Sequence, residues 1–259
     1  MLMKLSMHQF IKNMKFIKKP NLPENKVSTV AISHTAGESV KKLNNMGIDT
    51  IIIPDNPFLP GPVKSHADLQ LLHLENNTIF CQNEHLFSGE LKEKFFIHTI
   101  KEKAGNKYPD DVRLNCAIIG KKIICNEKTI SKDILEYAYT NDYIIINVNQ
   151  GYSRCSVCIL NENAIITDDE SIYRASQNFL NDAELISKDS IVLKGYNYGF
   201  IGGCCGKIDE EKIAFNGRIE SHKDYKKIID ILQRNNIDAE ELDSCPLTDI
   251  GGILPLIEY

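Results

Sequence analysis

"RCSVCILNENAIITDDESIYRASQNFLNDAE", residues 154–184, holds most of one copy of the pattern that decides the fold. Two short apolar runs flank the polar turn NEN at residues 161–163, as they do in a β-hairpin. A helical stretch follows at residues 170–184, and the apolar run at residues 190–196 predicts a further strand. One copy is therefore expected to be a ββαβ unit.

The same unit recurs along the chain. Three more hairpins are expected around polar turns at residues 75–77, 120–121 and 209–211. Each is followed by a helical stretch, and these lie at residues 89–105, 131–142 and 222–236.

The two ends of the chain together supply a fifth unit. Residues 248–259 form a first strand without a second, and residues 27–55 supply the missing strand, helix and strand. A repeat divided between the termini favours a closed ring. We therefore predict an α/β fold, a five-bladed pseudosymmetric ββαβ propeller closed between its N- and C-terminal segments. An open α/β sheet without symmetry is the alternative.

The composition is that of an ordinary globular protein. Of 259 residues, 42% are hydrophobic and 25% are charged, which is sufficient for a sizeable core. The formal net charge of -5 makes nucleic acid an unexpected partner. The chain shows no signal peptide and no apolar run long enough to span a membrane, which predicts a cytoplasmic protein. We expect residues 1–26 to form an N-terminal extension and residues 27–259 to form one domain.

The eight cysteines are expected to be mostly buried. They lie in apolar, β-branched surroundings, and in a reducing compartment such cysteines behave as small hydrophobic residues. Cys155 and Cys158 form a CxxC pair, but the chain has no second pair at zinc spacing, and strand residues three apart face opposite ways. No metal is therefore expected, and no motif calls for a nucleotide, a flavin or another cofactor.

Strand periodicity predicts which side chains face the centre of the ring. Successive strand residues alternate between faces, so residues were counted back from each turn in steps of two. The count divides the strand residues into two sets, one for each face. One set is mostly apolar. The other set is polar or small and contains Asp68, Gln70, Arg113, Asn115, Arg154, Ser156, Gly202 and Cys204. His66 has the same parity as Asp68, and Asp249 is placed with them. These residues are expected to line a central polar cavity.

The adjacent Cys204 and Cys205 are expected on opposite faces of a strand, so they neither pair nor share a metal. Cys205 is then buried, and Cys204 faces the cavity. A cavity cysteine near charged groups can act as a thiolate nucleophile. The alternative is that Cys204 only fills space.

Five ββαβ units in a ring resemble the pentein, or guanidino-group-modifying, superfamily. The resemblance covers the chain from Val27 onward and is carried by the motifs HADLQLLHLENNTIF, CSVCILNENAIITDD and DIGGILPL. Arginine deiminases, amidinotransferases, dimethylarginine dimethylaminohydrolases and agmatine deiminases have this fold, as does a non-catalytic ribosome anti-association factor. The resemblance implies a pentein fold and a small ligand that carries a guanidino or amidino group.

Two positions depart from the pattern of the deiminase-like enzymes. Their nucleophilic cysteine follows a glycine pair, whereas here Gly251 and Gly252 lead to Pro255 at the cysteine position. Their histidine belongs on an earlier first strand, where this chain has Arg154 or a neighbour. Either the protein binds its ligand without chemistry, or the chemistry has moved to another repeat.

If the active site has moved to another repeat, the charges of the cavity residues suggest which of them form it. A guanidinium is a planar fork of donors, so Asp68 and Asp249 are suited to bind it. His66 is the candidate base and Cys204 the candidate nucleophile. The expected function is binding, with possible hydrolysis or transfer, of a small guanidino or amidino metabolite. The competing interpretation is a catalytically inactive pentein that binds a macromolecular partner. The sequence leaves the oligomeric state open.

The other end of the ligand is assigned to arginines. Arg113 and Arg154 suit the carboxylate of an amino-acid-like ligand. In the alternative, these arginines pair with the two aspartates across the ring as a structural network. The remaining polar members of the expected binding set are Gln70, Asn115 and Ser156.

Overall fold

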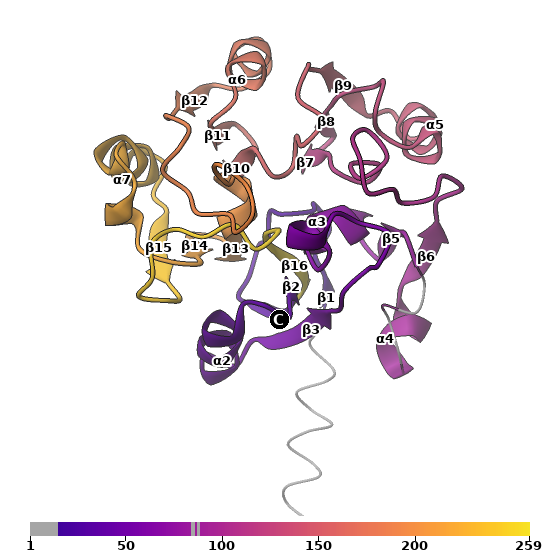
Figure 1. The fold of residues 1–259 in the computed structure, drawn as a ribbon, viewed down its shortest axis with the longest axis horizontal. Coiled ribbons are helices and arrows are strands. Elements are labelled where there is room, and N and C mark those ends of the chain that lie inside the picture. Colours follow the sequence, from indigo (N-terminus) through magenta and orange to yellow (C-terminus); the bar gives the residue numbers. More distant parts are fainter. Residues whose placement is uncertain (1–14, 84–85, 87–88) are drawn as a thin grey trace, which may run out of the picture.

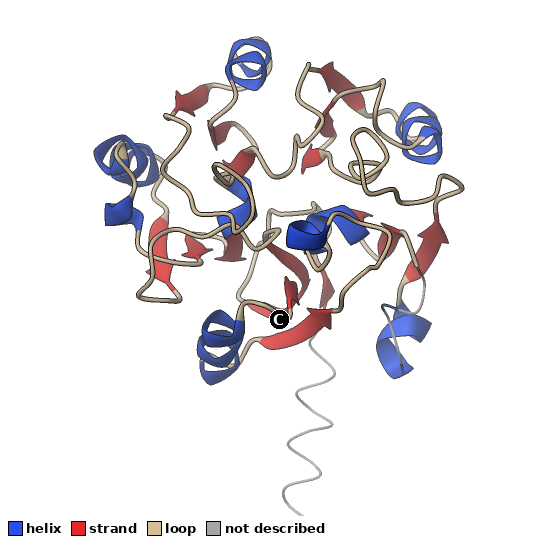
Figure 2. Ribbon diagram, in the orientation of Figure 1, coloured by secondary structure: helices blue, strands red, loops and turns tan. Residues whose placement is uncertain are grey.

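The computed structural model describes residues 15–83, 86 and 89–259. Within these residues, five small sheets stand around a common centre (Figure 1). Most of the helices lie on the outer rim, outside the sheets (Figure 2). Residues 1–14 of the expected N-terminal extension lie outside the described residues. None of the helices in the described part of the chain is long and apolar enough to cross a membrane.

Four blades repeat the predicted order of strand, strand, helix and strand. In each blade the first two strands pair antiparallel, and the third strand runs parallel to the second. Their elements are β4 (Leu71–Glu75), β5 (Thr78–Cys81), α4 (Gly89–Lys94) and β6 (Phe96–Thr99); β7 (Ala117–Ile119), β8 (Lys122–Cys125), α5 (Lys132–Thr140) and β9 (Ile144–Asn147); β10 (Val157–Asn161), β11 (Ala164–Thr167), α6 (Glu170–Ser176) and β12 (Asp182–Leu185); β13 (Cys205–Asp209), β14 (Lys212–Phe215), α7 (Tyr225–Arg234) and β15 (Asp238–Glu241).

The remaining blade joins the two ends of the chain. Its strands and helix are β16 (Ile253–Glu258), β2 (Val27–Ser33), α2 (Gly37–Asn45) and β3 (Asp49–Ile53), with β1 (Lys15–Phe16) at the edge. Strand β16 pairs antiparallel with β2, and β2 pairs parallel with β3. The predicted five-unit ring, closed between the terminal segments, is therefore confirmed.

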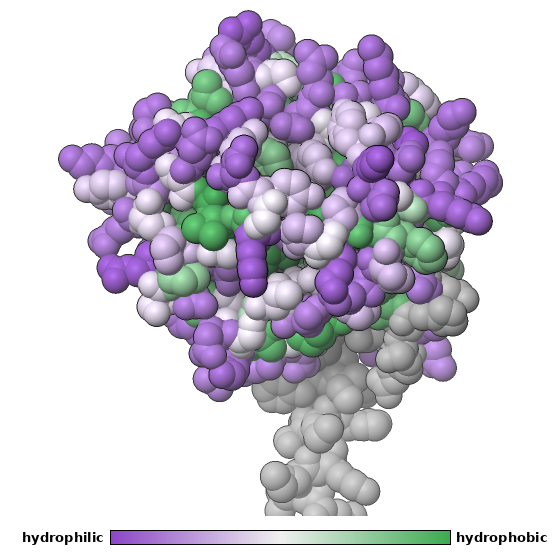
Figure 3. Space-filling view, in the orientation of Figure 1, coloured by the Kyte–Doolittle hydropathy of each residue, from purple (hydrophilic) through white to green (hydrophobic). Residues whose placement is uncertain are grey.

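Neighbouring blades share hydrophobic cores. Leu160 and Ile166 of one blade pack in the same buried cluster as Ile213 and Phe215 of the next. A similar cluster joins the blades that contain β4 and β7. The face seen in Figure 3 is mostly hydrophilic, with hydrophobic residues visible in hollows toward its middle.

Three elements differ from the prediction. The helix expected at residues 170–184 ends at Ser176, and its last residues form strand β12 instead. Strand β12 pairs parallel with β11, so pairing between elements overrides the helical pattern. The strand expected at residues 190–196 is a loop, in which Ile191 and Leu193 are buried. The helix expected at residues 89–105 is likewise only α4, followed by β6.

A helical turn precedes the first strand in several blades. Residues 67–70 form the short helix α3 (Ala67–Gln70), and residues 202–204 form the 3-10 helix η3 (Gly202–Cys204). Residues 153–156 form a turn in front of β10. A count in steps of two applies only to extended strands, so it misplaces side chains in these turns.

Candidate functional site

A cavity of about 200 Å³ is lined by residues that precede strands β4, β10 and β16 and by the loop after β12. His66 enters it from the residue before α3, and Asp249 enters it from the segment before β16. Cys155 enters it from the turn before β10. All three side chains are buried, so a thiol, an imidazole and a carboxyl group share one small cavity.

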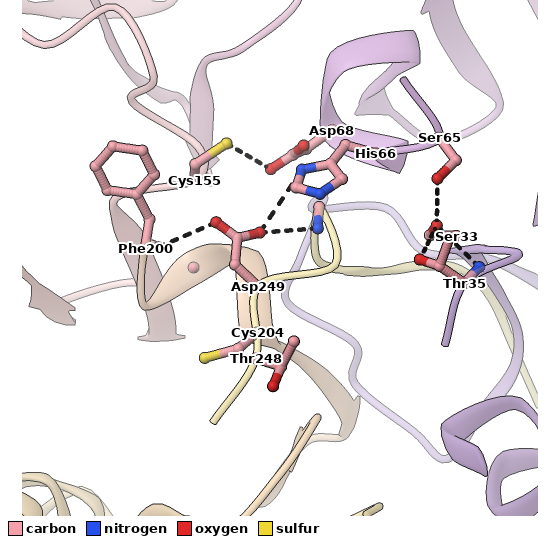
Figure 4. A network of polar contacts seen from close by, with 12 residues as sticks. Ser33, Thr35, Ser65, His66, Asp68, Cys155, Phe200, Cys204, Thr248 and Asp249 are labelled. Atoms are coloured by element: carbon pink, nitrogen blue, oxygen red, sulfur yellow. Dashed lines mark hydrogen bonds and ion pairs between the residues drawn. The ribbon is translucent and has the colours of Figure 1, made fainter. Parts of the chain in front are cut away.

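The Cys155 sulfur has two polar partners. Its thiol donates a hydrogen bond to Oδ2 of Asp68 over 2.9 Å (Figure 4). Nδ2 of Asn115 donates to the sulfur over 3.1 Å. Oδ1 of Asn115 also accepts from the backbone N–H groups of Arg154 and Cys155, at 2.8 and 3.2 Å. Asn115 therefore fixes both the backbone and the sulfur of Cys155.

Backbone donors orient the Asp249 carboxyl group. Its Oδ1 accepts from the N–H of Gly251 and its Oδ2 from the N–H of Phe200, each over 3.0 Å. Nδ1 of His66 lies 3.6 Å from the same Oδ1 (Figure 4). A Cβ atom at Gly203 would lie only 2.0 Å from Oδ1, so this glycine is what allows the carboxyl group its position.

The charges around Cys155 determine its resting state. Burial raises the pKa of the Cys155 thiol, and the nearby Asp68 and Asp249 raise it further. Burial also raises the pKa of Asp249, whereas His66 lowers it. The resting thiol is therefore protonated. A cation placed between the carboxyl groups would favour both carboxylates and the thiolate.

Aromatic rings form a second wall of the cavity. Tyr152, Tyr196, Tyr198 and Phe200 all line it. The Phe200 ring centroid lies 5.8 Å from that of Tyr152 and 5.7 Å from that of Tyr198. The Tyr152 hydroxyl donates a hydrogen bond to the Asp111 carboxyl group behind this wall. Aromatic faces attract cations, and so do carboxylates, so the aromatic wall and the carboxyl groups both favour a positively charged ligand.

The location predicted for Cys204 is wrong. Its sulfur donates to the backbone oxygen of Ile201 over 3.1 Å, and the residue is fully buried in the cluster that contains Phe215. Figure 4 shows its side chain apart from the His66 and Asp249 group. The helical turn η3 causes the error, because Cys204 precedes the strand instead of belonging to it. Its place agrees with the alternative that it fills space.

Four other predicted residues also lie away from the cavity, whereas Asp68 and Asn115 contact Cys155 without lining it. Gln70 donates to the backbone oxygens of residues 54 and 64, and the buried Ser156 does not line the cavity. Arg113 pairs with Asp110 over 2.5 Å. Arg154 donates to the backbone oxygens of residues 157 and 202. In the described part of the chain, neither arginine forms an ion pair with Asp68 or Asp249, so the predicted cross-ring pairing is absent there as well.

Cys155 is the site residue that sequence reasoning missed, because the count in steps of two assigned it to the apolar set. With the strand starts known from the structure, a pattern emerges. The residues two positions before the first strand of each blade all reach the centre: Leu69 and Cys155 line the cavity, Asn115 contacts Cys155, Gly203 contacts Asp249, and Gly251 contacts His66.

Several solved structures of guanidino-group-modifying enzymes have a similar fold. A dimethylarginine dimethylaminohydrolase from Pseudomonas aeruginosa, a cysteine-to-serine variant in complex with citrulline, is 8% identical, with a TM-score of 0.55 over 85% of this chain and 93% of that one. An amidinotransferase of saxitoxin biosynthesis from Microseira wollei is 10% identical, with a TM-score of 0.55 over 89% and 92%. An inosamine-phosphate amidinotransferase from Streptomyces griseus is 9% identical, with a TM-score of 0.56 over 93% and 97%.

These similarities establish the fold. The chain has the pentein fold, as predicted, and identities this low carry no further conclusion. A comparison of the sequence with those of curated proteins gave no match. Residues 31–254, which are most of the chain, match the model of DUF6873, a family of unknown function. The protein therefore belongs to this family.

Proposed function

We propose that the cavity binds a small metabolite with a guanidino or amidino group and that Cys155 attacks the central carbon of that group. The observation that carries the proposal is the position of the Cys155 thiol. It lines one cavity with His66 and Asp249 and donates a hydrogen bond to Asp68. The enzymes with similar folds, whose names include amidinotransferases, add support.

Recognition depends on the two carboxyl groups. A guanidinium or amidinium group offers a planar set of N–H donors, which match carboxylate oxygens on either side. Asp249 lines the cavity. Asp68 does not line it but contacts the Cys155 sulfur, and its Oδ1 is buried without a hydrogen-bond partner among the described residues. A ligand N–H group that reaches past the sulfur would satisfy this unpaired acceptor.

The first half of the reaction follows from the thiol contact. The thiol proton passes to Asp68, and the Sγ–carbon bond forms as the sulfur attacks. His66 gives a proton to the departing amine nitrogen, and the carbon–nitrogen bond breaks. Cys155 is then linked to the remaining amidino group.

The second half releases the product. Water attacks the amidino carbon, His66 takes a proton from the water, and the carbon–sulfur bond breaks. Asp68 returns its proton to the sulfur. The urea-type product leaves with the positive charge as an extra proton, which it loses to the solvent, where the released amine takes up a proton. In a transfer reaction, an acceptor amine takes the place of water.

The test is affinity labelling with chloroacetamidine, in which a thiolate displaces chloride from a carbon next to an amidinium group. We expect selective labelling of Cys155 at neutral pH, lost in Cys155→Ser and retained in Cys204→Ala. Iodoacetamide, which has no cationic group, is the control reagent. Labelling in which the partly exposed Cys245 reacts first, and Cys155 reacts no faster with the cationic reagent, would contradict the proposal.

The competing function is binding of a macromolecular partner without turnover, and experiments can distinguish it from the proposed one. It predicts neither a preference of Cys155 for the cationic reagent nor release of amine or ammonia from any guanidino compound. Amine release that disappears in Cys155→Ser would exclude it.

A further inference from the structure

We infer that the ligand of this cavity carries no carboxylate: the site selects a guanidino or amidino cation whose tail is uncharged or positively charged. The inference rests on the proposed function and narrows its substrate class. It replaces the expectation that two arginines hold the carboxylate of an amino-acid-like ligand.

Apart from His66, which pairs with Asp249, the charged groups at the cavity are acidic. Asp249 lines it, Asp68 accepts a hydrogen bond from the thiol of Cys155, and Asp111 accepts one from the hydroxyl of Tyr152. Among the described residues, no lysine or arginine lines the cavity. A carboxylate in this space would be desolvated beside other carboxyl groups, with no lysine or arginine to compensate.

Both expected arginines are engaged elsewhere. The Arg113 guanidinium pairs with Asp110 and donates to the backbone oxygen of Thr129 over 3.0 Å. Nη1 of Arg154 donates to the backbone oxygens of Val157 and Gly202, each over 3.2 Å. Turning either arginine toward the cavity would break these bonds, and the Arg154 side chain is buried where it lies.

The wall toward the mouth suits a tail without negative charge. Tyr196 is 45% exposed, and the neighbouring Asn197 is also exposed, so these two residues mark the mouth. The ring faces of Tyr152 and Phe200 attract cations and pack against methylene groups, but they repel anions. A volume of about 200 Å³ also restricts the ligand to a small metabolite, because pockets for drug-sized ligands measure about 300–1,000 Å³.

The experiment compares competitors for chloroacetamidine labelling of Cys155 in the full-length protein. Arginine and agmatine differ only by a carboxylate, and butylguanidine has an uncharged tail. We expect agmatine and butylguanidine to halve the labelling rate at concentrations at least ~10-fold lower than arginine, as an unpaired buried charge requires. Arginine that protects as well as agmatine would overturn the inference. Labelling that none of the three slows would refute the proposed function itself, and the inference with it.

A gain-of-function variant tests the cause. Asn197→Arg places a guanidinium at the mouth on an exposed side chain, so the fold should tolerate it. We expect protection by arginine to improve several-fold and protection by agmatine to weaken, because the new cation pairs with a carboxylate and repels an ammonium group. Asn197→Gln is the matched control and should leave the ratio of the two competitors unchanged. If the ratio of protection by arginine to protection by agmatine is unchanged in Asn197→Arg, the lack of positive charge at the mouth is not the cause of the preference for ligands without a carboxylate.

Discussion

Asn115 is the residue that connects the Cys155 sulfur to the rest of the site. Its amide oxygen accepts from two backbone N–H groups, and its amide nitrogen donates to the sulfur and to the backbone oxygen of Asp68. A hydrogen bond donated to sulfur stabilises the thiolate, and this donation partly opposes the effect of Asp68 on the thiol pKa. Asn115 is therefore a positioning residue that also adjusts reactivity.

Asn115→Asp should slow the labelling of Cys155 and change its pH profile. The variant keeps the accepting oxygen but replaces the donor with a further negative charge, which raises the thiol pKa. Less thiolate is then present at any given pH, so the iodoacetamide rate profile should move to higher pH. Asn115→Ala is the companion variant and should cost about 1–3 kcal/mol of unfolding free energy, because it leaves buried N–H groups unpaired. A profile unchanged in Asn115→Asp would show that the contact with sulfur is only structural.

The turn of η3 is the element that makes room for the Asp249 carboxyl group. Gly203→Ala should displace that group, because the new Cβ would lie 2.0 Å from Oδ1. We expect selective chloroacetamidine labelling to fall to the level of iodoacetamide, together with a lower unfolding temperature. Gly37→Ala at the start of α2 is the control, since nothing lies within 4 Å of its Cβ position. Equal behaviour of the two variants would mean that the position of Asp249 does not depend on Gly203.

The loop after β12 is held to the ring by two carboxyl groups. Oδ2 of Asp168 accepts from the N–H of Ile201 over 3.0 Å, next to the bond between Asp249 and Phe200. Burial raises the pKa of Asp168 from its ordinary 3.8 to about 7. A carboxyl group with a raised pKa binds its proton more tightly in the folded chain than in the unfolded chain. The stability that it contributes is complete below pH 3.8 and is lost as the pH rises toward 7.

Asp168→Asn should therefore weaken the pH dependence of stability. The asparagine keeps an oxygen for the N–H of Ile201 but does not titrate. We expect the unfolding temperature of the wild type to fall more than that of the variant between pH 5 and pH 8, as thermal unfolding by circular dichroism would measure. The exposed Asp238→Asn is the control. A variant that loses as much stability as the wild type over this range would assign the effect to another group.

The repeat pattern predicted the elements well where pairing and periodicity agree. Helices α5 and α7 lie within their expected ranges, and the hairpin turns are found where polar residues interrupt apolar runs. The site was predicted only in part. His66 and Asp249 line the cavity, but Cys204 and Cys155 were exchanged, because local turns before the strands have no periodicity of their own. Such turns depend on contacts between blades, which one sequence does not reveal.

Ring closure is a property of the whole molecule. All residues of β16 are buried, and the strand pairs with β2 on one side and β1 on the other. Deletion of residues 253–259 would expose the cores on both sides of the gap, so we expect loss of the cooperative unfolding transition. If strand pairing stabilises the ring, the fold should not depend on where the two termini lie, provided that every strand keeps its partners.

A circular permutant tests this closure. Lys15 pairs with Glu258, so a short Gly/Ser linker in place of residues 1–14 can join the C-terminus to Lys15. New ends are placed between Glu210 and Glu211, in the turn that joins β13 and β14. Because all strand pairs are retained, we expect cooperative unfolding and wild-type chloroacetamidine labelling of Cys155. A permutant that folds but is not labelled selectively would place a requirement of the site in the turn after β13, and a permutant that does not fold would show that the ring depends on covalent continuity between those two strands.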